Sequence, residues 1–224
     1  MLTFITINFD DVVGLKSTVR SLQKANIIGP WEQVIIDGGS SDGSREFLDN
    51  LDYSHVHIFS EPDDGIYDAM NKGIARSNGS LLHFLNSGDT ISGELDVSAL
   101  GPFDLLKVTV GKSQRPYTVR NLISPFAMPY CHQGMIFPAS SISYDLKYSL
   151  ASDLDYVYRN GYYNFNNSEL IDTCEVNFDD DGVSNRHYVT RDVESFKIIY
   201  NNNKLKGMVF LIIRLLIWPL KALR

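Results

Sequence analysis

Apolar runs and helical repeats alternate along the first ninety residues of the chain. Short runs rich in β-branched and aromatic residues predict strands, and each run ends in polar or small residues. Between these runs, apolar positions recur every three or four residues, as in amphipathic helices. The predicted strands are Thr3–Asn8, Gln33–Asp37, His55–Ser60 and Leu81–Leu85, and the predicted helices are Val12–Ala25, Ser41–Leu51 and Ile66–Arg76.

This order of strands and helices predicts an α/β fold with a mostly parallel sheet and helices on both faces. In such sheets, ligands bind beyond the carboxyl ends of the strands. Polar clusters follow all four predicted strands at that edge, so we expect a ligand site there. The clusters are Asn8-Phe9-Asp10, Asp37-Gly38-Gly39-Ser40, Glu61-Pro62-Asp63-Asp64 and Asn86-Ser87-Gly88-Asp89.

The pattern beyond residue 92 is more mixed. Short strands are predicted at Leu105–Val110, Tyr117–Val119 and Gly134–Phe137, and a helix at Ser152–Asn160. From Val189 onward the pattern favours one long helix with a polar interruption at residues 201–203.

Charge is distributed unevenly along the 224 residues, whose net charge is −7. The last 21 residues hold five basic residues and no acid, which leaves 15 basic against 27 acidic residues in the remainder. Phosphate contacts need Lys and Arg, so this acidic body argues against nucleic acid as a partner. Cys131 and Cys174 follow no metal-binding spacing and indicate a reducing compartment. The apolar run Leu2–Ile7 is short and lacks a basic lead, so we expect a strand rather than a signal peptide.

The C-terminal segment 204–224 differs from the body because it is both apolar and basic. A spanning helix needs about 20 apolar residues, and Arg214 interrupts this segment too early for that. Basic residues and a Trp near its ends suit a helix that lies in a membrane interface. The alternative is a helix packed on the body or on a second subunit.

The segment Asp37–Ser40 combines an acid, two glycines and the start of a predicted helix. Glycines allow a tight turn and a close approach to a ligand, and free amides at a helix start favour an anion. Asp37 can accept hydrogen bonds from a ribose or a base. A plain strand-turn-helix junction has the same pattern.

Two further polar segments allow ligand contacts. Asp89 can hold Mg²⁺ or Mn²⁺ against a diphosphate, because hard cations take oxygen ligands, although a polar turn would look alike. Lys72 can reach a phosphate, and Asp68 or Asn71 a sugar hydroxyl. Asp68 and Lys72 are spaced i, i+4 and can also simply pair with each other.

Taken together, four segments resemble glycosyltransferase family 2, and more narrowly the bacterial enzymes of exopolysaccharide, capsule and colanic-acid assembly. The resemblance is close over about residues 2–90 and looser through three later segments. The close segments are Thr6–Asn8, Ile36–Ser44, Gly65–Gly73 and Phe84–Asp89, and the looser ones are Cys131–Gly134, Ala151–Asp155 and Asp181–Ser184.

That resemblance implies a GT-A fold, which is a Rossmann-like, mostly parallel sheet flanked by helices, with a smaller mixed acceptor-side sheet and a C-terminal helix. It also implies an inverting mechanism, a nucleotide-sugar donor and a divalent metal, Mg²⁺ or Mn²⁺. We therefore expect one domain over residues 1–200, with residues 1–90 as the nucleotide-sugar half and 91–200 as the acceptor half. Residues 204–224 would form an amphipathic basic helix.

The family's functional residues carry over by position. Asp153 matches the catalytic base, Asp89 the surviving metal-binding acid, and His132 and Gln133 line the acceptor side. Asp155 points to another helix face than Asp153, so only one of the two acids should face the site. The nucleotide-sugar contacts would be Thr6, Asn8, Asp37, Gly39, Ser40, Asp68, Asn71, Lys72 and Ser87.

The chain departs from the family pattern at acidic positions. Gly38 replaces the second acid of the usual Asp-Asp-Gly-Ser, and Asn86 and Gly88 replace two acids of the usual Asp-x-Asp-Asp. Fewer acids mean fewer metal ligands from the protein. Diphosphate oxygens and water can then complete an octahedron around a metal held by Asp89.

These observations predict an inverting glycosyltransferase that acts on a saccharide or lipid-linked acceptor in cell-surface polysaccharide synthesis. We expect a cytoplasmic protein, peripheral on the inner face of the plasma membrane, and an oligomer is possible. One alternative is a nucleotidyltransferase. That class requires a Gly-rich basic loop directly after the first strand, and the acidic segment Phe9-Asp10-Asp11 at this position counts against it. Another is an inactive homologue that binds a sugar nucleotide or a partner subunit.

Overall fold

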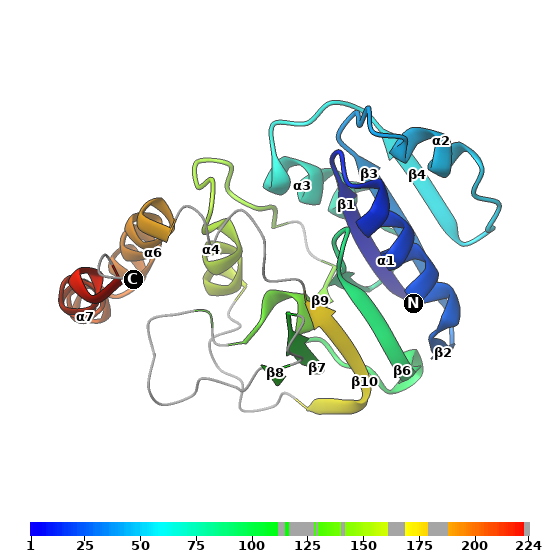
Figure 1. Cartoon of the computed structure of the whole chain (residues 1–224). Coiled ribbons are helices and arrows are strands. Elements are labelled where there is room, and N and C mark those ends of the chain that lie inside the picture. The colour runs from blue at the N-terminus through cyan, green and yellow to red at the C-terminus, as the bar shows by residue number, and fades with distance from the viewer. Residues whose placement is uncertain are drawn as a thin grey trace.

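A five-stranded sheet with strand order β4-β3-β1-β5-β9 forms the N-terminal part of the molecule (Figure 1). The computed structural model describes residues 1–111, 115–116, 128, 130–139, 142–160, 169–178 and 188–221. The first four strands run parallel and β9 is antiparallel to β5, which confirms the predicted sheet. The strands are β1 (Leu2–Asn8), β3 (Trp31–Asp37), β4 (Val56–Ser60), β5 (Leu81–Phe84) and β9 (Phe137–Pro138).

Helices cover both faces of this sheet and thereby bury its central strands on both sides. All seven residues of β1 are buried, as expected for a strand inside a parallel sheet. Helices α1 (Val12–Lys24) and α2 (Ser44–Asp49) pack on the face that carries Ile35. Helix α3 (Ile66–Arg76) packs on the opposite face, where a Cβ at Gly73 would lie 2.4 Å from Ile5 Cγ2. Glycine at this position therefore lets α3 approach β1 closely.

The second sheet is mixed, as predicted, although it also has five strands, in the order β2-β6-β10-β7-β8. Strands β2, β6 and β10 were not predicted from the sequence. Their apolar alternation is weak, because β6 exposes residues 92–94 and carries Gly93 at φ 95°, and β10 carries Asp172 and Glu175. The strands are β2 (Asn26–Ile28), β6 (Thr90–Asp96), β7 (Leu105–Val110), β8 (Arg115–Pro116) and β10 (Leu170–Phe178), with a 3₁₀ helix η1 (Val97–Ala99) after β6.

The predicted strand Gly134–Phe137 is wrong over most of its length. Residues His132–Gly134 form a 3₁₀ helix, η2, and only Phe137 of the predicted range joins β9. The chain turns at Gly134, where a Cβ would lie 2.4 Å from Val108 Cγ2. The predicted strand Tyr117–Val119 and the motif Asp181–Ser184 lie outside the described residues.

Three helices complete the chain: α4 (Ser152–Arg159), α6 (Tyr188–Asn202) and α7 (Lys204–Lys221). The predicted polar interruption at residues 201–203 divides this region into two helices, α6 and α7, rather than one long helix. At the break, Asn203 Oδ1 accepts a hydrogen bond from Lys206 N at 3.0 Å. Helix α7 then packs against α6, and a Cβ at Gly207 would lie 2.5 Å from Tyr200 Cα. Within the described residues, no helix combines the length and the apolar character needed to cross a membrane.

Candidate functional site

The ends of β1, β3 and β5 meet at one edge of the first sheet, as the strand pattern predicted. Asn8 and Asp37 are register partners, and Asn8 Nδ2 donates to Asp37 Oδ1 at 2.9 Å. On the other side, Ser87 Oγ donates to Asn8 Oδ1 at 2.9 Å. Asn8 therefore connects the loop after β3 with the loop after β5.

Asp37 is fully buried and organises this edge. Besides Asn8, it accepts hydrogen bonds from Ser40 Oγ at 2.5 Å, Ser40 N at 3.1 Å and Ser60 Oγ at 2.8 Å. Burial raises the pKa of Asp37, but the hydrogen bonds from Ser40, Asn8 and Ser60 outweigh it and hold the pKa below its ordinary value. These four bonds use the full acceptor capacity of a carboxylate. Asp37 therefore orders the surrounding side chains and the turn after β3.

The loop after β1 is tied to the turn after β3. Asp10 has a positive φ of 48°, its N donates to Ser40 Oγ at 2.8 Å, and its Oδ1 accepts from Ser41 N at 2.7 Å. Gly39 has φ 87°, a conformation that suits glycine. Thr6, in contrast, is buried inside the sheet, where its Oγ1 accepts from Gln33 Nε2 at 3.0 Å. Thr6, which was predicted to contact the nucleotide sugar, therefore lies along β1 at a distance from the strand end where Asn8 and Asp37 meet.

The loop that carries Asp89 is fastened to α1 by Thr18, a buried residue that sequence reasoning did not single out. Thr18 Oγ1 donates to Asp89 O at 2.7 Å and accepts from Gly88 N at 3.1 Å. A Cβ at Gly14 would lie 2.7 Å from Gly88 N, so a glycine in the first turn of α1 permits this contact. The signal in the sequence is weak: Thr18 is a polar residue at the helical spacing of the apolar residues Leu15 and Leu22.

The same loop offers hard oxygen ligands. Asp89 is buried, and Asn86 Oδ1 is buried with no hydrogen-bond partner. Among the described residues, no three His, Cys, Asp or Glu side chains gather into a group that would hold a metal by themselves. A cation here would therefore take Asp89 and Asn86 together with oxygens from a ligand and water, and this donor set fits Mg²⁺ or Mn²⁺.

On α3, the predicted ligand contacts are engaged with the protein itself. Lys72 Nζ donates to Pro62 O at 2.6 Å and lies 3.1 Å from Asp68 Oδ2, which is the simple i, i+4 pair. Burial acts to raise the pKa of Asp68, but hydrogen bonds from Asp64 N and Lys72 lower it overall. Asn71 Oδ1 accepts from Tyr144 N at 2.7 Å and its Nδ2 donates to Tyr144 O at 3.0 Å. Asn71 thus ties α3 to the later part of the chain.

Asp153 lies in the first turn of α4 and reaches α3. Its Oδ1 accepts from Tyr67 OH at 3.3 Å and from Leu154 N at 2.8 Å. Burial raises the pKa of Asp153 to about 6, against the effect of these hydrogen bonds and of the Arg191 charge. A carboxyl with this pKa is close to the ideal for a base at neutral pH. Tyr67 was not predicted as a site residue, although it lies inside the Gly65–Gly73 segment.

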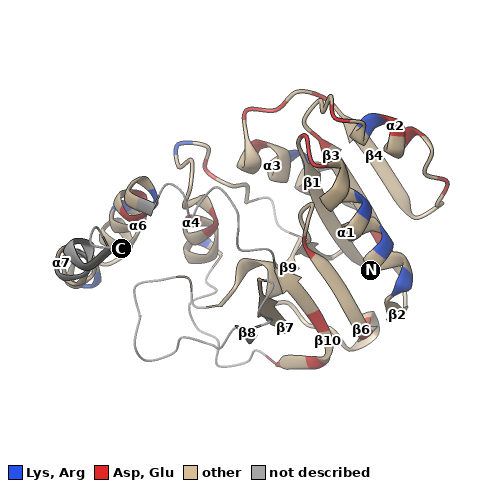
Figure 2. Cartoon of the chain, viewed as in Figure 1, with Lys and Arg blue, Asp and Glu red and all other residues tan. Residues whose placement is uncertain are grey.

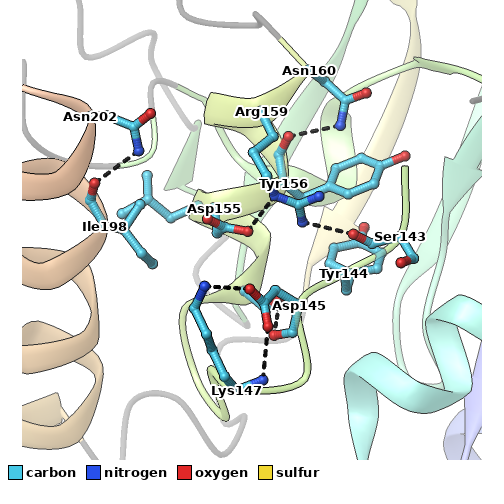
Figure 3. Close-up of polar contacts among 12 residues, drawn as sticks. Ser143, Tyr144, Asp145, Lys147, Asp155, Tyr156, Arg159, Asn160, Ile198 and Asn202 are labelled. Atoms are coloured by element: carbon cyan, nitrogen blue, oxygen red, sulfur yellow. Dashed lines mark hydrogen bonds and ion pairs between the residues drawn. The ribbon is translucent and has the colours of Figure 1, made fainter. Parts of the chain in front are cut away.

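Asp155, two residues further along, takes no part in this contact. Arg159 Nε donates to Asp155 Oδ2 at 2.6 Å, and the same guanidinium donates to Ser143 O at 2.7 Å (Figure 3). This ion pair holds Asp155 on another side of α4, so only Asp153 of the two acids lies at Tyr67.

His132 is buried inside the protein, whereas Gln133 is half-buried. His132 is buried against the rings of Phe84 and Phe137, both centred 5.1 Å away, and its Nε2 lies 2.7 Å from Tyr144 OH. Burial, with a smaller effect of His83, lowers the pKa of His132 to about 3, so the ring is neutral. Gln133 Oε1 accepts from Cys131 Sγ at 3.2 Å. These contacts make His132 a core residue in this structure.

The chain has the same fold as several solved structures. The chain is similar to S. aureus TarS in complex with UDP-GlcNAc, with a TM-score of 0.62 at 12% identity over 90% of this chain and 65% of that one. It is also similar to the mannosyltransferase PcManGT from Pyrobaculum calidifontis in complex with GDP-Man and Mn²⁺, with a TM-score of 0.58 at 11% identity over 95% of this chain and 74% of that one. The fold therefore defines the chain as a GT-A protein.

Sequence similarity gives the family. The model of Glycosyl transferase family 2 matches residues 3–123, and the chain belongs to this family. An uncharacterised glycosyltransferase of Mycobacterium tuberculosis is 34% identical over 177 residues, which are 69% of this chain and 66% of that protein. A PGL/p-HBAD biosynthesis glycosyltransferase of Mycobacterium bovis is 28% identical over 149 residues, 57% of each chain. The chain thus spans about two thirds or less of the length of these relatives.

Proposed function

We propose that the protein is an inverting glycosyltransferase that moves one sugar from a nucleotide-diphosphate donor to a saccharide or lipid-linked acceptor. The observation that carries the proposal is the Asp153 carboxyl, with a pKa of about 6, held against Tyr67 of the nucleotide-binding half. The bound UDP-GlcNAc and GDP-Man of the two structural neighbours support the donor class. The M. bovis relative is a PGL/p-HBAD biosynthesis glycosyltransferase, which supports a biosynthetic role for the transfer. From the motif resemblance we propose that this role lies in cell-surface polysaccharide assembly of the bacterial exopolysaccharide or capsule type.

In the proposed reaction, an acceptor hydroxyl oxygen forms the new bond to the anomeric carbon. The bond from that carbon to the donor diphosphate breaks, and its electron pair leaves on the diphosphate oxygen. Asp153 takes the hydroxyl proton as the attack proceeds. One carboxylate is enough for a single inversion through an oxocarbenium-like transition state. A hexosyl donor fits this chemistry, and the nucleotide pocket is built around Asn8, Asp37 and Ser40.

We propose that Asp89 and Asn86 hold Mg²⁺ or Mn²⁺. A bound cation would neutralise charge on the departing diphosphate. A cation suits this edge of the sheet, because acidic residues lie in the loops there, whereas Lys and Arg residues lie along α1 (Figure 2). The Mn²⁺ in the complex of PcManGT supports this choice of metal.

Calorimetry with UDP tests the metal site directly. We expect Mn²⁺ to raise the affinity of the wild type for UDP at least about tenfold, since a cation–diphosphate contact replaces water at both partners. Asp89→Asn should lose this gain because it removes the one protein carboxylate. Asp64→Asn, which changes an exposed acid at the same edge, is the matched control and should keep it. Equal UDP affinity of all three proteins with and without Mn²⁺ would contradict the metal assignment.

The reaction products separate the three candidate functions. A glycosyltransferase releases nucleoside diphosphate from a nucleotide sugar, whereas a nucleotidyltransferase exchanges pyrophosphate with it. An inactive homologue binds the nucleotide and does neither. A screen of nucleotide sugars that follows both products therefore tests the proposed reaction and identifies the donor.

We further propose that α7 seats the protein on the inner face of the plasma membrane. Four exposed apolar side chains lie along α7 at spacings of three, four and three residues, which places them on one face of the helix. Segment 204–224 carries five basic residues and no acid, so an anionic lipid surface attracts it, while a second copy of the same helix repels it. The four residues, which form the exposed stripe of α7, are Leu205 (75% exposed), Met208 (46%), Ile212 (54%) and Leu215 (55%).

Replacing the exposed stripe of α7 with Gln should move the protein from the pellet to the supernatant in sedimentation with phosphatidylglycerol vesicles. The substitutions leave the contact of Phe210 with α6 intact, so the fold is expected to hold. The matched control replaces four exposed apolar residues elsewhere, Val13, Ile28, Leu146 and Leu170, and should sediment like the wild type. If the stripe variant still sediments, or if it only dissociates a dimer, membrane docking by this face is wrong.

A further inference from the structure

Glu194 of α6 holds the backbone immediately before α4. Its Oε1 accepts from Ser149 N and from Ser149 Oγ, each at 2.9 Å. Its Oε2 accepts from Leu150 N at 2.8 Å and from Ala151 N at 3.0 Å. Four donors use the acceptor capacity of one carboxylate, and bonds to an ionised acceptor are stronger than neutral ones. Three consecutive amides of this segment are therefore bound by one side chain more than forty residues away in sequence.

This contact matters because Asp153 follows two residues later. Ala151, the residue that precedes α4, makes no side-chain capping bond. The start of α4 is instead set from outside by Glu194, with help from Ser152 Oγ, which donates to Asp145 O at 2.9 Å. The position of Asp153 in the first turn of α4 thus depends on where Glu194 holds residues 149–151.

An apolar cluster supports the same connection. Ala151 and Leu154, on either side of Asp153, pack in one buried cluster with Ile198 and Ile199 of α6 and Phe210 of α7. The polar and the apolar contacts both join α6 to the start of α4. Helix α6 therefore backs the segment that carries Asp153 on the side away from α3.

We propose that Glu194 is a positioning residue for Asp153: its carboxylate binds the amides of residues 149–151 and so places the Asp153 carboxyl at Tyr67. The inference rests on the proposed role of Asp153 as the base. The hydrogen bonds of Glu194 run to residues 149–151 and not to Asp153, so it acts on Asp153 through the backbone of this segment. Its charge also contributes to the raised pKa of Tyr67, although burial is the largest cause. Proton transfer demands close alignment of the base, and a displacement of about 1 Å can cost on the order of a hundredfold in rate.

Glu194→Gln is the decisive variant, because it keeps the shape of the side chain but presents an amide NH₂ to backbone amides. We expect kcat of sugar transfer to fall about tenfold to a hundredfold, while the KM for the donor and the calorimetric Kd for UDP stay unchanged. Lys197→Gln changes an exposed residue of the same helix and should retain wild-type kcat. Ser149→Ala removes only the hydroxyl bond and should show a smaller loss than Glu194→Gln.

Amide hydrogen exchange of residues 149–151 tests the same inference without any activity. Exchange of these amides should be at least about tenfold faster in Glu194→Gln than in Lys197→Gln, because the acceptor that protects them is lost. If the wild type transfers no sugar from any donor, the proposed function fails while the exchange result still reports on Glu194. Wild-type kcat in Glu194→Gln would overturn the inference, and so would equal losses of UDP affinity and kcat, which would indicate general unfolding.

Discussion

Asp153→Asn is expected to lower kcat of sugar transfer by about 10²- to 10⁴-fold, the usual contribution of a general base. The amide keeps the size of the side chain but takes up no proton. The affinity for UDP should stay at the wild-type value, because Asp153 is held by Tyr67 and takes no part in the hydrogen bonds of Asp37 that order the proposed nucleotide pocket. Initial rates with a saturating donor, together with UDP calorimetry, measure the two quantities separately.

The pH dependence of kcat/KM is a second test of the role of Asp153. Asp153 works as a base only when ionised, and burial raises its pKa to about 6. Wild-type kcat/KM should therefore fall as the pH drops through about 6, and the residual activity of Asp153→Asn should lack this limb. Asp155→Asn is the matched control on the same helix. It breaks the ion pair with Arg159, so it should lower stability but keep the acid limb. An unchanged rate in Asp153→Asn would show that another group accepts the proton.

Asp37→Asn is expected to weaken UDP binding by about tenfold to a hundredfold, because it disrupts the charge-assisted bonds that order the sheet edge. Bonds to a charged acceptor contribute about 1.5–3 kcal/mol each, and the Asn amide would face Ser40 N with a donor in one of its two orientations. The turn after β3 and the loop after β1 both depend on Ser40, so both should loosen. Ser60→Ala removes a single donor to Asp37 and should have a smaller effect in the same calorimetric measurement.

The stability of Asp37→Asn should also depend less on pH than that of the wild type. The pKa of Asp37 is lowered in the folded protein, so its stabilising contribution is present above the unfolded pKa of about 3.9. That contribution is lost as the pH falls through the lower, folded-state pKa. Urea unfolding at pH 7 and near pH 3 should show a smaller difference in the free energy of unfolding for the variant than for the wild type. If the free energy of unfolding changes as much between these two pH values in Asp37→Asn as in the wild type, Asp37 does not govern the acid sensitivity.

Local patterns predicted the parts of the site that depend on strand ends. The parallel sheet brings Asn8, Asp37 and Ser87 together because their positions follow directly from where β1, β3 and β5 end. The same logic failed for β6 and β10, since their exposed and charged residues hide the alternation that marks a half-buried strand. Tyr67, Thr18 and Glu194 were missed because nothing in their local sequence shows the distant partner.

Several residues that matched the family motif turned out to hold the protein together in this structure. Asn71 binds the backbone of Tyr144, Lys72 binds Pro62 and Asp68, and His132 is buried among aromatic rings. A motif records which residue types stand at which spacing. It does not record whether a side chain turns toward a ligand or toward a neighbouring segment.

By itself, the sequence determined the α/β class, the edge at which the site forms, the acid that serves as the proposed base and the basic, apolar character of the C-terminal segment. The class, the edge and the character of the C-terminal segment follow from periodicity, charge and order along the chain, which are local properties, whereas Asp153 follows from the resemblance to the family. Only the tertiary structure decided the raised pKa of Asp153, the four bonds of Asp37 and the contact of Glu194 with residues 149–151. Each of these depends on burial or on hydrogen bonds between segments far apart in sequence, and such contacts exist only once the chain has folded.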